Sequence, residues 1–236
     1  MARELQSLIL PASLPVIAGL EIGVRTRQAQ VVVGGDYYDA VVLPDGRLGV
    51  CCADVSGKGV PGQLRLPLVK YAFRVCAREF AEPAAMVTRL NQILCDELPD
   101  EIFVPLVYTV FDPAAGTVEL VGKHCPPCIW WPAPARCWPV SLRGVALGVV
   151  ADAVYGVSTI EFAPDDYLVL YSDGAIEAQD RRGEELGEAG LAALLAEATP
   201  ESAQDLANWL FQALDEHEVG AKRDDLTLVV VRRTKV

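Results

Sequence analysis

The sequence has no uninterrupted apolar run that approaches ~18 residues, the length needed for a membrane-spanning helix. Its first residues, MARELQSLILPASLP, lack the basic stretch followed by an apolar stretch that is typical of a secretory signal peptide. These two absences predict a soluble, cytoplasmic protein.

Positive charge is also scarce. The 236 residues include 20 Lys and Arg against 32 Asp and Glu, a formal net charge of −12. This balance argues against a nucleic-acid backbone or an anionic membrane as partner. It suits a protein that concentrates divalent cations, although many soluble proteins are acidic for solubility alone.

The seven cysteines do not form a disulfide pattern, because their number is odd and they are scattered through predicted strands and helices. Reduced thiols in the cytosol explain them better. The stretch HCPPC (124–128) invites a redox or zinc interpretation. However, a redox C-x-x-C opens a helix, whereas CPPCIWW runs into a strand, and a zinc site lacks a clear fourth ligand. We therefore expect neither.

Length and composition predict one domain over residues 1–236, with residues 1–15 as a connector helix and lead-in. Apolar residues make up 52% of the chain, enough for a core, and neither a repeat nor a low-complexity linker interrupts it. The order of elements is strands, two helices, strands, two helices and one strand. This predicts an α+β fold in which helix pairs cover antiparallel sheets. Strands are expected within 20–33 and at 46–55, 104–112, 116–123, 127–131, 155–162, 166–173 and 226–233, and helices at 2–9, 58–80 (Leu64, Leu68, Tyr71, Ala72 and Val75 at helical spacing), 83–98, 187–197 and 202–217.

Four aspartates share one setting, at the edge of an apolar strand and in or beside a turn. Asp36 follows VVVGG, Asp54 ends LGVCCAD, Asp173 ends YLVLYSD, and Asp224 with Asp225 precedes LTLVVV. One such aspartate is usually a turn cap. Four in matched settings suit hard cations such as Mg²⁺ and Mn²⁺, which prefer carboxylate, carbonyl and water oxygens. Two such ions about 4 Å apart can clamp a phosphoryl group for in-line attack, which makes a di-metal hydrolase a candidate.

Four motifs at these residues resemble the PPM/PP2C-type Ser/Thr phosphatases, and more narrowly their bacterial SpoIIE/RsbU branch. They are GGDYYD (34–39), ADVSGKGVPG (53–62), YSDGAIEA (171–178) and RDDLTLVV (223–230), in that order, and the likeness runs from about Leu5 to Arg232. The resemblance implies an αββα sandwich, two antiparallel sheets with a pair of helices on each outer face. It also implies a protein-serine/threonine phosphatase.

The resemblance further implies which residues act. Asp36, Asp54, Asp173 and Asp224 would hold two divalent cations, Mn or Mg, with Asp54 bridging them and the Val55 carbonyl completing the set. A water between the ions would attack phosphoserine or phosphothreonine without a phosphoenzyme. Gly34 and Gly35 would make room for the site.

The implied substrate is a phosphorylated STAS-type anti-anti-sigma regulator in bacterial partner switching. Control would come from a separate regulatory protein or from an upstream sensor domain. Two alternatives remain open: a catalytically weak or inactive phosphatase-fold binding module, and a two-metal phosphodiesterase or nuclease. The net charge of −12 disfavours the latter.

One segment departs from the family pattern. Where the family usually carries Asn-Ala-Gly-His, this chain has Val121-Gly122-Lys123-His124, and the missing asparagine lowers the expected catalytic strength. His124 either helps to position the substrate or is held structurally at the strand end. Lys58, in SGKG (56–59), faces either solvent or the substrate phosphate, since the spacing of a P-loop is absent.

Three further residues belong to the first motif. Of its two tyrosines, one is expected to pack into the sandwich and the other to line the cleft. For Asp39, we expect a hydrogen bond in a turn rather than a metal role.

Overall fold

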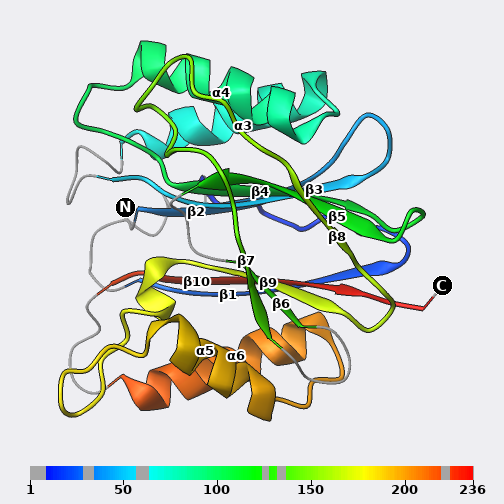
Figure 1. Ribbon diagram of the computed structural model, residues 1–236, viewed down its shortest axis with the longest axis vertical. Coiled ribbons are helices and arrows are strands. Elements are labelled where there is room, and N and C mark those ends of the chain that lie inside the picture. Colours follow the sequence, from blue (N-terminus) through cyan, green and yellow to red (C-terminus); the bar gives the residue numbers. More distant parts are fainter. Residues whose placement is uncertain are drawn as a thin grey trace.

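The computed structural model describes residues 9–28, 35–56, 64–123, 128–131, 137–218 and 224–235. Two five-stranded antiparallel sheets lie face to face, and one pair of helices covers the outer face of each sheet (Figure 1). The predicted αββα sandwich is therefore confirmed. Among the described residues, no helix has both the length and the apolar character to cross a bilayer.

The first sheet has the strand order β2-β3-β4-β5-β8, and helices α3 and α4 cover it. Each of these strands pairs antiparallel with its neighbour. The bounds are β2 Asp36–Val42, β3 Leu48–Asp54, α3 Leu66–Glu79, α4 Pro83–Glu97, β4 Leu106–Asp112, β5 Thr117–Lys123 and β8 Ser158–Glu161.

The second sheet has the order β1-β10-β9-β6-β7, and helices α5 and α6 cover it. A short 3₁₀ turn, η1, follows β9. The bounds are β1 Leu20–Arg27, β6 Cys128–Trp131, β7 Trp138–Val140, β9 Tyr167–Tyr171, η1 Asp173–Ala175, α5 Gly187–Glu197, α6 Ala203–His217 and β10 Leu226–Arg233.

Apolar side chains fill three layers, one between the sheets and one under each helix pair. The sequence of strand β3 is apolar without interruption because the strand lies between two of these layers. Val50 and Cys52 face the layer between the sheets, whereas Cys51 and Ala53 face the layer under α3 and α4. Successive side chains of a strand point to opposite faces, so both faces of β3 are buried. Burying one large apolar side chain stabilises the fold by about 1.5–3 kcal/mol.

Strand β2 is absent from the elements predicted from the sequence. Residues 29–33 of the expected strand region 20–33 lie outside the described residues, and so do residues 2–8 of the helix expected at 2–9. In β2, Tyr37 and Asp39 are completely buried beneath α3. A buried aspartate in a strand is unexpected from local sequence, because its charge needs a partner that lies elsewhere in the chain.

Helix α3 begins at Leu66, and its buried face differs from the predicted apolar spacing. Leu64, Tyr71 and Val75 are 69%, 67% and 50% exposed. The core side of the helix is instead formed by Leu66, Val69, Ala72, Phe73, Cys76 and Ala77. Both sides of this helix carry apolar residues at helical spacing, so the periodicity alone did not identify the side that packs.

Candidate functional site

Two of the predicted ligands lie opposite each other at one end of the first sheet. Asp36 opens β2 and Asp54 ends β3, and the two residues are register partners. Asp54 N donates to Pro105 O at 3.1 Å, and Val55 N donates to Gly35 O at 3.0 Å. The backbone on both sides of Asp54 is thus fixed by hydrogen bonds.

The other two predicted ligands belong to the second sheet. Asp173 opens η1 two residues after the end of β9, and Asp224 lies two residues before β10. The hydroxyl of Ser172 accepts a hydrogen bond from Thr227 N at 2.8 Å, and Ser172 N donates to Thr227 O at 3.0 Å. These bonds hold the end of β9 beside the start of β10.

A group of three carboxylates forms where these segments meet. One carboxylate oxygen from each of Asp173, Glu177 and Asp224 lies within 4.8 Å of the others. Glu177 was not among the predicted site residues. Its N–H donates to Asp173 O at 2.9 Å, so it stands one helical turn after Asp173. The spacing of D and E in SDGAIEA is the sequence signal that could have identified it, since residues four apart share a helical face.

A direct bond links the two halves of the site. Gly35 N donates to Asp225 Oδ2 at 2.9 Å, which ties the start of β2 to the start of β10. A hydrogen bond from a backbone N–H to an ionised carboxylate is stronger than one between neutral groups, so this bond holds the two segments together.

Two glycines at the site leave space that a Cβ atom would fill. A Cβ on Gly35 would lie 2.5 Å from Asp54 Oδ1 and 3.0 Å from Val55 O. A Cβ on Gly174 would lie 2.0 Å from Asp225 O. Contacts this short are excluded, so both glycines are required for the carboxylates to approach. The predicted role of Gly35 agrees with this geometry, while Gly34 lies outside the described residues.

The carboxylates repel one another in a partly desolvated setting. Burial, followed by the charges of Asp173 and Asp224, raises the pKa of Asp54 to about 7. Burial and the charge of Asp224 raise the pKa of Asp173 to about 6. Burial and the charge of Asp54 raise the pKa of Asp36 well above its usual value. A site with this excess of negative charge is stabilised by a bound cation, and its oxygen donors are those that Mg²⁺ and Mn²⁺ prefer.

Asp39 lies in the same motif but outside the carboxylate group. Arg74 Nε donates to Asp39 Oδ2 at 2.6 Å, Arg74 Nη2 donates to Asp39 Oδ1 at 3.0 Å, and Tyr37 Oη donates to Asp39 Oδ2 at 2.7 Å. The prediction of a hydrogen bond in a turn is therefore wrong, because Asp39 lies within strand β2 and forms an ion pair with Arg74 of α3. Its role is structural.

The two tyrosines of the motif pack on opposite faces of β2. Tyr37 is buried under α3, and its ring meets that of Phe73 edge to face at 6.2 Å. Tyr38 is half-buried against the layer between the sheets. The expectation that one tyrosine packs into the sandwich is confirmed, but Tyr38 packs as well, so the expectation that the other tyrosine lines the cleft is not borne out. His124 and Lys58, the predicted substrate-binding residues, lie outside the described residues.

The fold is that of PP2C-type phosphatases. The SiaA-PP2C domain of Pseudomonas aeruginosa superposes with a TM-score of 0.84 at 21% identity, covering 99% of this chain and 94% of that one. The catalytic domain of the serine/threonine protein phosphatase PstP, solved with 2 manganese ions, gives a TM-score of 0.67 at 14% identity, covering 92% and 99%.

The family model described as stage II sporulation protein E (SpoIIE) matches residues 44–234, so the chain belongs to the SpoIIE family. Phosphoserine phosphatase RsbU of Bacillus subtilis (strain 168) is 26% identical over 235 residues, 99% of this chain and 69% of RsbU. Protein IcfG of Synechocystis sp. is 24% identical over 259 residues, but the chain spans only 40% of its length. The prediction of a PP2C-type phosphatase of the SpoIIE/RsbU branch is confirmed.

Proposed function

We propose that the protein is a metal-dependent serine/threonine phosphoprotein phosphatase. The observation that carries the proposal is the meeting of carboxylates from both sheets. Asp173, Glu177 and Asp224, beside the second sheet, have oxygens within 4.8 Å of one another. Burial, followed by their charges, raises the pKa of Asp54 at the end of β3 in the first sheet. Carboxylates gathered in this way repel one another, and a bound divalent cation would relieve that repulsion.

Asp36, Asp54, Asp173 and Asp224, with the Val55 carbonyl, are the proposed ligands of two Mn or Mg ions. Asp54 faces Asp36 across the strand pair and is close enough to Asp173 and Asp224 for their charges to shift its pKa, so it is suited to bridge. When bound, the cations supply Lewis acidity and a nucleophilic water for attack at phosphorus. We add Glu177 to the ligand set.

The chain's own contribution is to bring these oxygens together and to keep them there. The Gly35–Asp225 bond and the Ser172–Thr227 pair join three of the four motifs, and the bond from Val55 N to Gly35 O joins the fourth. Gly35 and Gly174 allow the backbones to approach. A site that is assembled before substrate binds needs little reorganisation during the reaction.

The proposed substrate is a phosphorylated STAS-type regulator in partner switching. Its support is the family and the name of RsbU, a phosphoserine phosphatase. Residues 1–236 would act as one phosphatase domain, controlled by a separate protein or by an upstream sensor. His124 and Lys58 remain the proposed substrate contacts.

Phosphate release tests the proposal. An aryl phosphate and a phosphoserine peptide should both be hydrolysed with Mn²⁺ or Mg²⁺, and chelator should stop hydrolysis. Preferential cleavage of an oligonucleotide would instead favour the phosphodiesterase. Stable Mn²⁺-dependent binding of a phosphoprotein without phosphate release would favour the inactive binding module.

Asp224 and Asp225 should respond differently to the same substitution. Asp224→Asn removes a charge from the carboxylate group, so activity should fall about 100-fold. Asp225→Asn should cost less than tenfold, because an asparagine oxygen can still accept the bond from Gly35 N. Initial rates of aryl phosphate hydrolysis at saturating Mn²⁺ compare the two, and the reverse order would show that the ligand of this motif is Asp225.

A further inference from the structure

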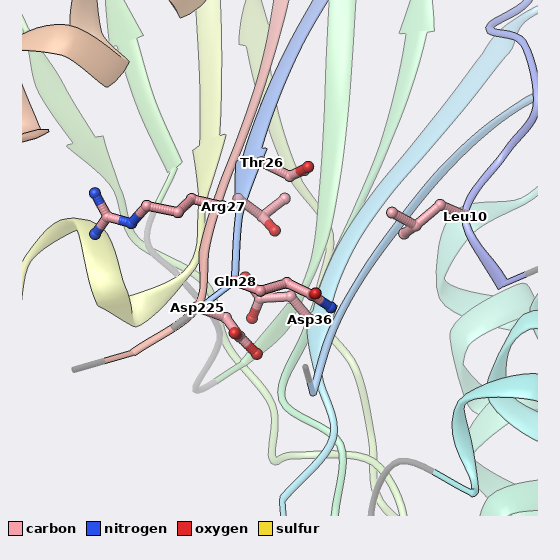
Figure 2. Close-up of a pocket in the computed structure, with 7 residues that line it drawn as sticks. Leu10, Thr26, Arg27, Gln28, Asp36 and Asp225 are labelled. Carbon is pink, nitrogen blue, oxygen red and sulfur yellow. The ribbon is translucent and has the colours of Figure 1, made fainter. Parts of the chain in front are cut away.

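A small cavity adjoins Asp36 beside the carboxylate group. Its volume is about 10 Å³, and its lining includes Leu10, Thr26, Gln28, Asp36, Asp225 and Thr227. Figure 2 shows Gln28 and Asp36 at this cavity, with Leu10 reaching toward it from a different segment. A single buried water needs about 10–15 Å³, so the cavity has room for one water.

Three residues that line this cavity carry a buried polar atom without a hydrogen-bond partner within the described ranges: Arg27 at Nε, Gln28 at Nε2 and Asp36 at Oδ2. Gln28 Nε2 and Asp36 Oδ2 are the pair that matters here. Asp36 Oδ2 and Gln28 Nε2 are both inaccessible to solvent, and neither has a hydrogen-bond partner within the described ranges. One is an acceptor and the other is a donor, so they are complementary. The two atoms do not bond to each other directly. A water between a buried donor and a buried acceptor can bond to both of them.

The position of Gln28 is held by its neighbour in the chain. The Arg27 guanidinium points away from the cavity toward α6 (Figure 2), where Nη1 donates to Asp215 Oδ1 at 2.9 Å and Nη2 donates to Glu218. These bonds hold the end of β1 against α6, and so they also hold the backbone from which the Gln28 side chain extends.

We infer that Gln28 is a positioning residue for Asp36 and acts through one water bound in this cavity. The water accepts a hydrogen bond from Gln28 Nε2 and donates one to Asp36 Oδ2. Thr26 and Thr227 also line the cavity, and the Thr227 hydroxyl hydrogen-bonds to the Asp36 carboxylate. A carboxylate oxygen has two lone pairs, so the bond from the water leaves Asp36 free to bind a cation.

The inference rests on the proposed function, because it makes Gln28 part of the support of a cation ligand. Groups that orient metal ligands in this way typically change metal affinity by about 10- to 100-fold. The substitution Gln28→Met keeps an unbranched side chain of similar length and removes the donor.

Titration of the full chain with Mn²⁺ by calorimetry tests the inference. Gln28→Met should raise the Kd for Mn²⁺ about tenfold, while the unfolding temperature in chelator stays that of the wild type. The matched control is Gln212→Met, which replaces a glutamine of α6 that bonds only to Glu216 in the described structure, and which should leave the Kd unchanged. In an Asp36→Asn background, Gln28→Met should have no further effect, because its route to the cation is already lost.

The inference is overturned if Gln28→Met binds Mn²⁺ as the wild type does, or if it loses the same factor in the Asp36→Asn background. A wild type that binds no Mn²⁺ would refute the proposed function itself. A crystal structure of the wild type gives a second test that needs no variant. A water within hydrogen-bond distance of both Gln28 Nε2 and Asp36 Oδ2 is expected, and a cavity without it would refute the bridge.

Discussion

Replacing Asp54 by asparagine is expected to lower kcat by ~100-fold or more while the fold is kept. Asparagine has the shape of aspartate but lacks its charge, and Asp54 is the proposed bridge between two cations. Several kcal/mol of charge stabilisation in the transition state depend on such ions, and each 1.4 kcal/mol is about tenfold in rate. Hydrolysis of an aryl phosphate at saturating Mn²⁺ measures the effect.

The same substitution should stabilise the protein when no metal is bound. Because the pKa of Asp54 is raised from 3.8 to about 7, the wild-type protein loses stability as the pH rises from about 4 to about 7. Asparagine removes this loss, so Asp54→Asn in chelator should unfold at a higher temperature than the wild type at pH 7.5 and at a similar one at pH 4.

The exposed Asp100→Asn is the matched control and should change neither the rate nor the stability. Wild-type activity in Asp54→Asn would refute the assignment of Asp54 as a ligand.

Replacing Arg74 by methionine is expected to destabilise the protein by about 3 kcal/mol. Asp39 is 0% exposed and its charge is balanced by Arg74, whose side chain is 35% exposed. Removing one partner of a buried ion pair leaves an uncompensated buried charge, which costs about 3–5 kcal/mol. The low end applies because Tyr37 still donates a hydrogen bond to Asp39. Urea unfolding with chelator present measures the loss.

Arg78→Met, at an exposed position in the last turn of the same helix, is the control and should cost less than about 1 kcal/mol. Adding Asp39→Asn to Arg74→Met should recover part of the stability, because no buried charge then remains. Equal losses in Arg74→Met and Arg78→Met would show that the pair contributes nothing.

The parts of the fold that the sequence predicted well are those with a strong local pattern. Strands β3, β4, β9 and β10 are apolar on both faces, and α4 and α6 carry one clear apolar stripe. Strand β2 was missed because the buried charge of Asp39 is balanced by Arg74, which lies 35 residues away. A pattern within one segment carries no information about a partner so distant.

The residues of the site also fall into those that a local sequence pattern predicts and those that it does not. The placement of Asp36, Asp54, Asp173 and Asp224 at strand ends is a local signal, and the structure brings these ends together. Glu177 has a local signal too, its spacing from Asp173. The relation between Gln28 and Asp36 has none, since it depends on a cavity between separate segments.

The pairing of β1 with β10 sets the time at which the site can form during synthesis. β1 begins at Leu20, yet its antiparallel partner β10 runs from Leu226 to Arg233, far away in the sequence. During synthesis, β1 therefore cannot pair with β10 until residues 226–233 have left the ribosome. Pairings between such distant segments form late, because the intervening chain must first be ordered.

The carboxylate group of the site also forms late, because it includes residues next to β10. Asp36 and Asp54 emerge early, whereas Asp224 emerges just before the last strand, and Gly35 has its bond to Asp225 only once that strand has joined. A nascent chain has no complete cation site until Asp224 and β10 have left the ribosome. The proposed activity is thus withheld from unfinished chains by the order in which the strands are made.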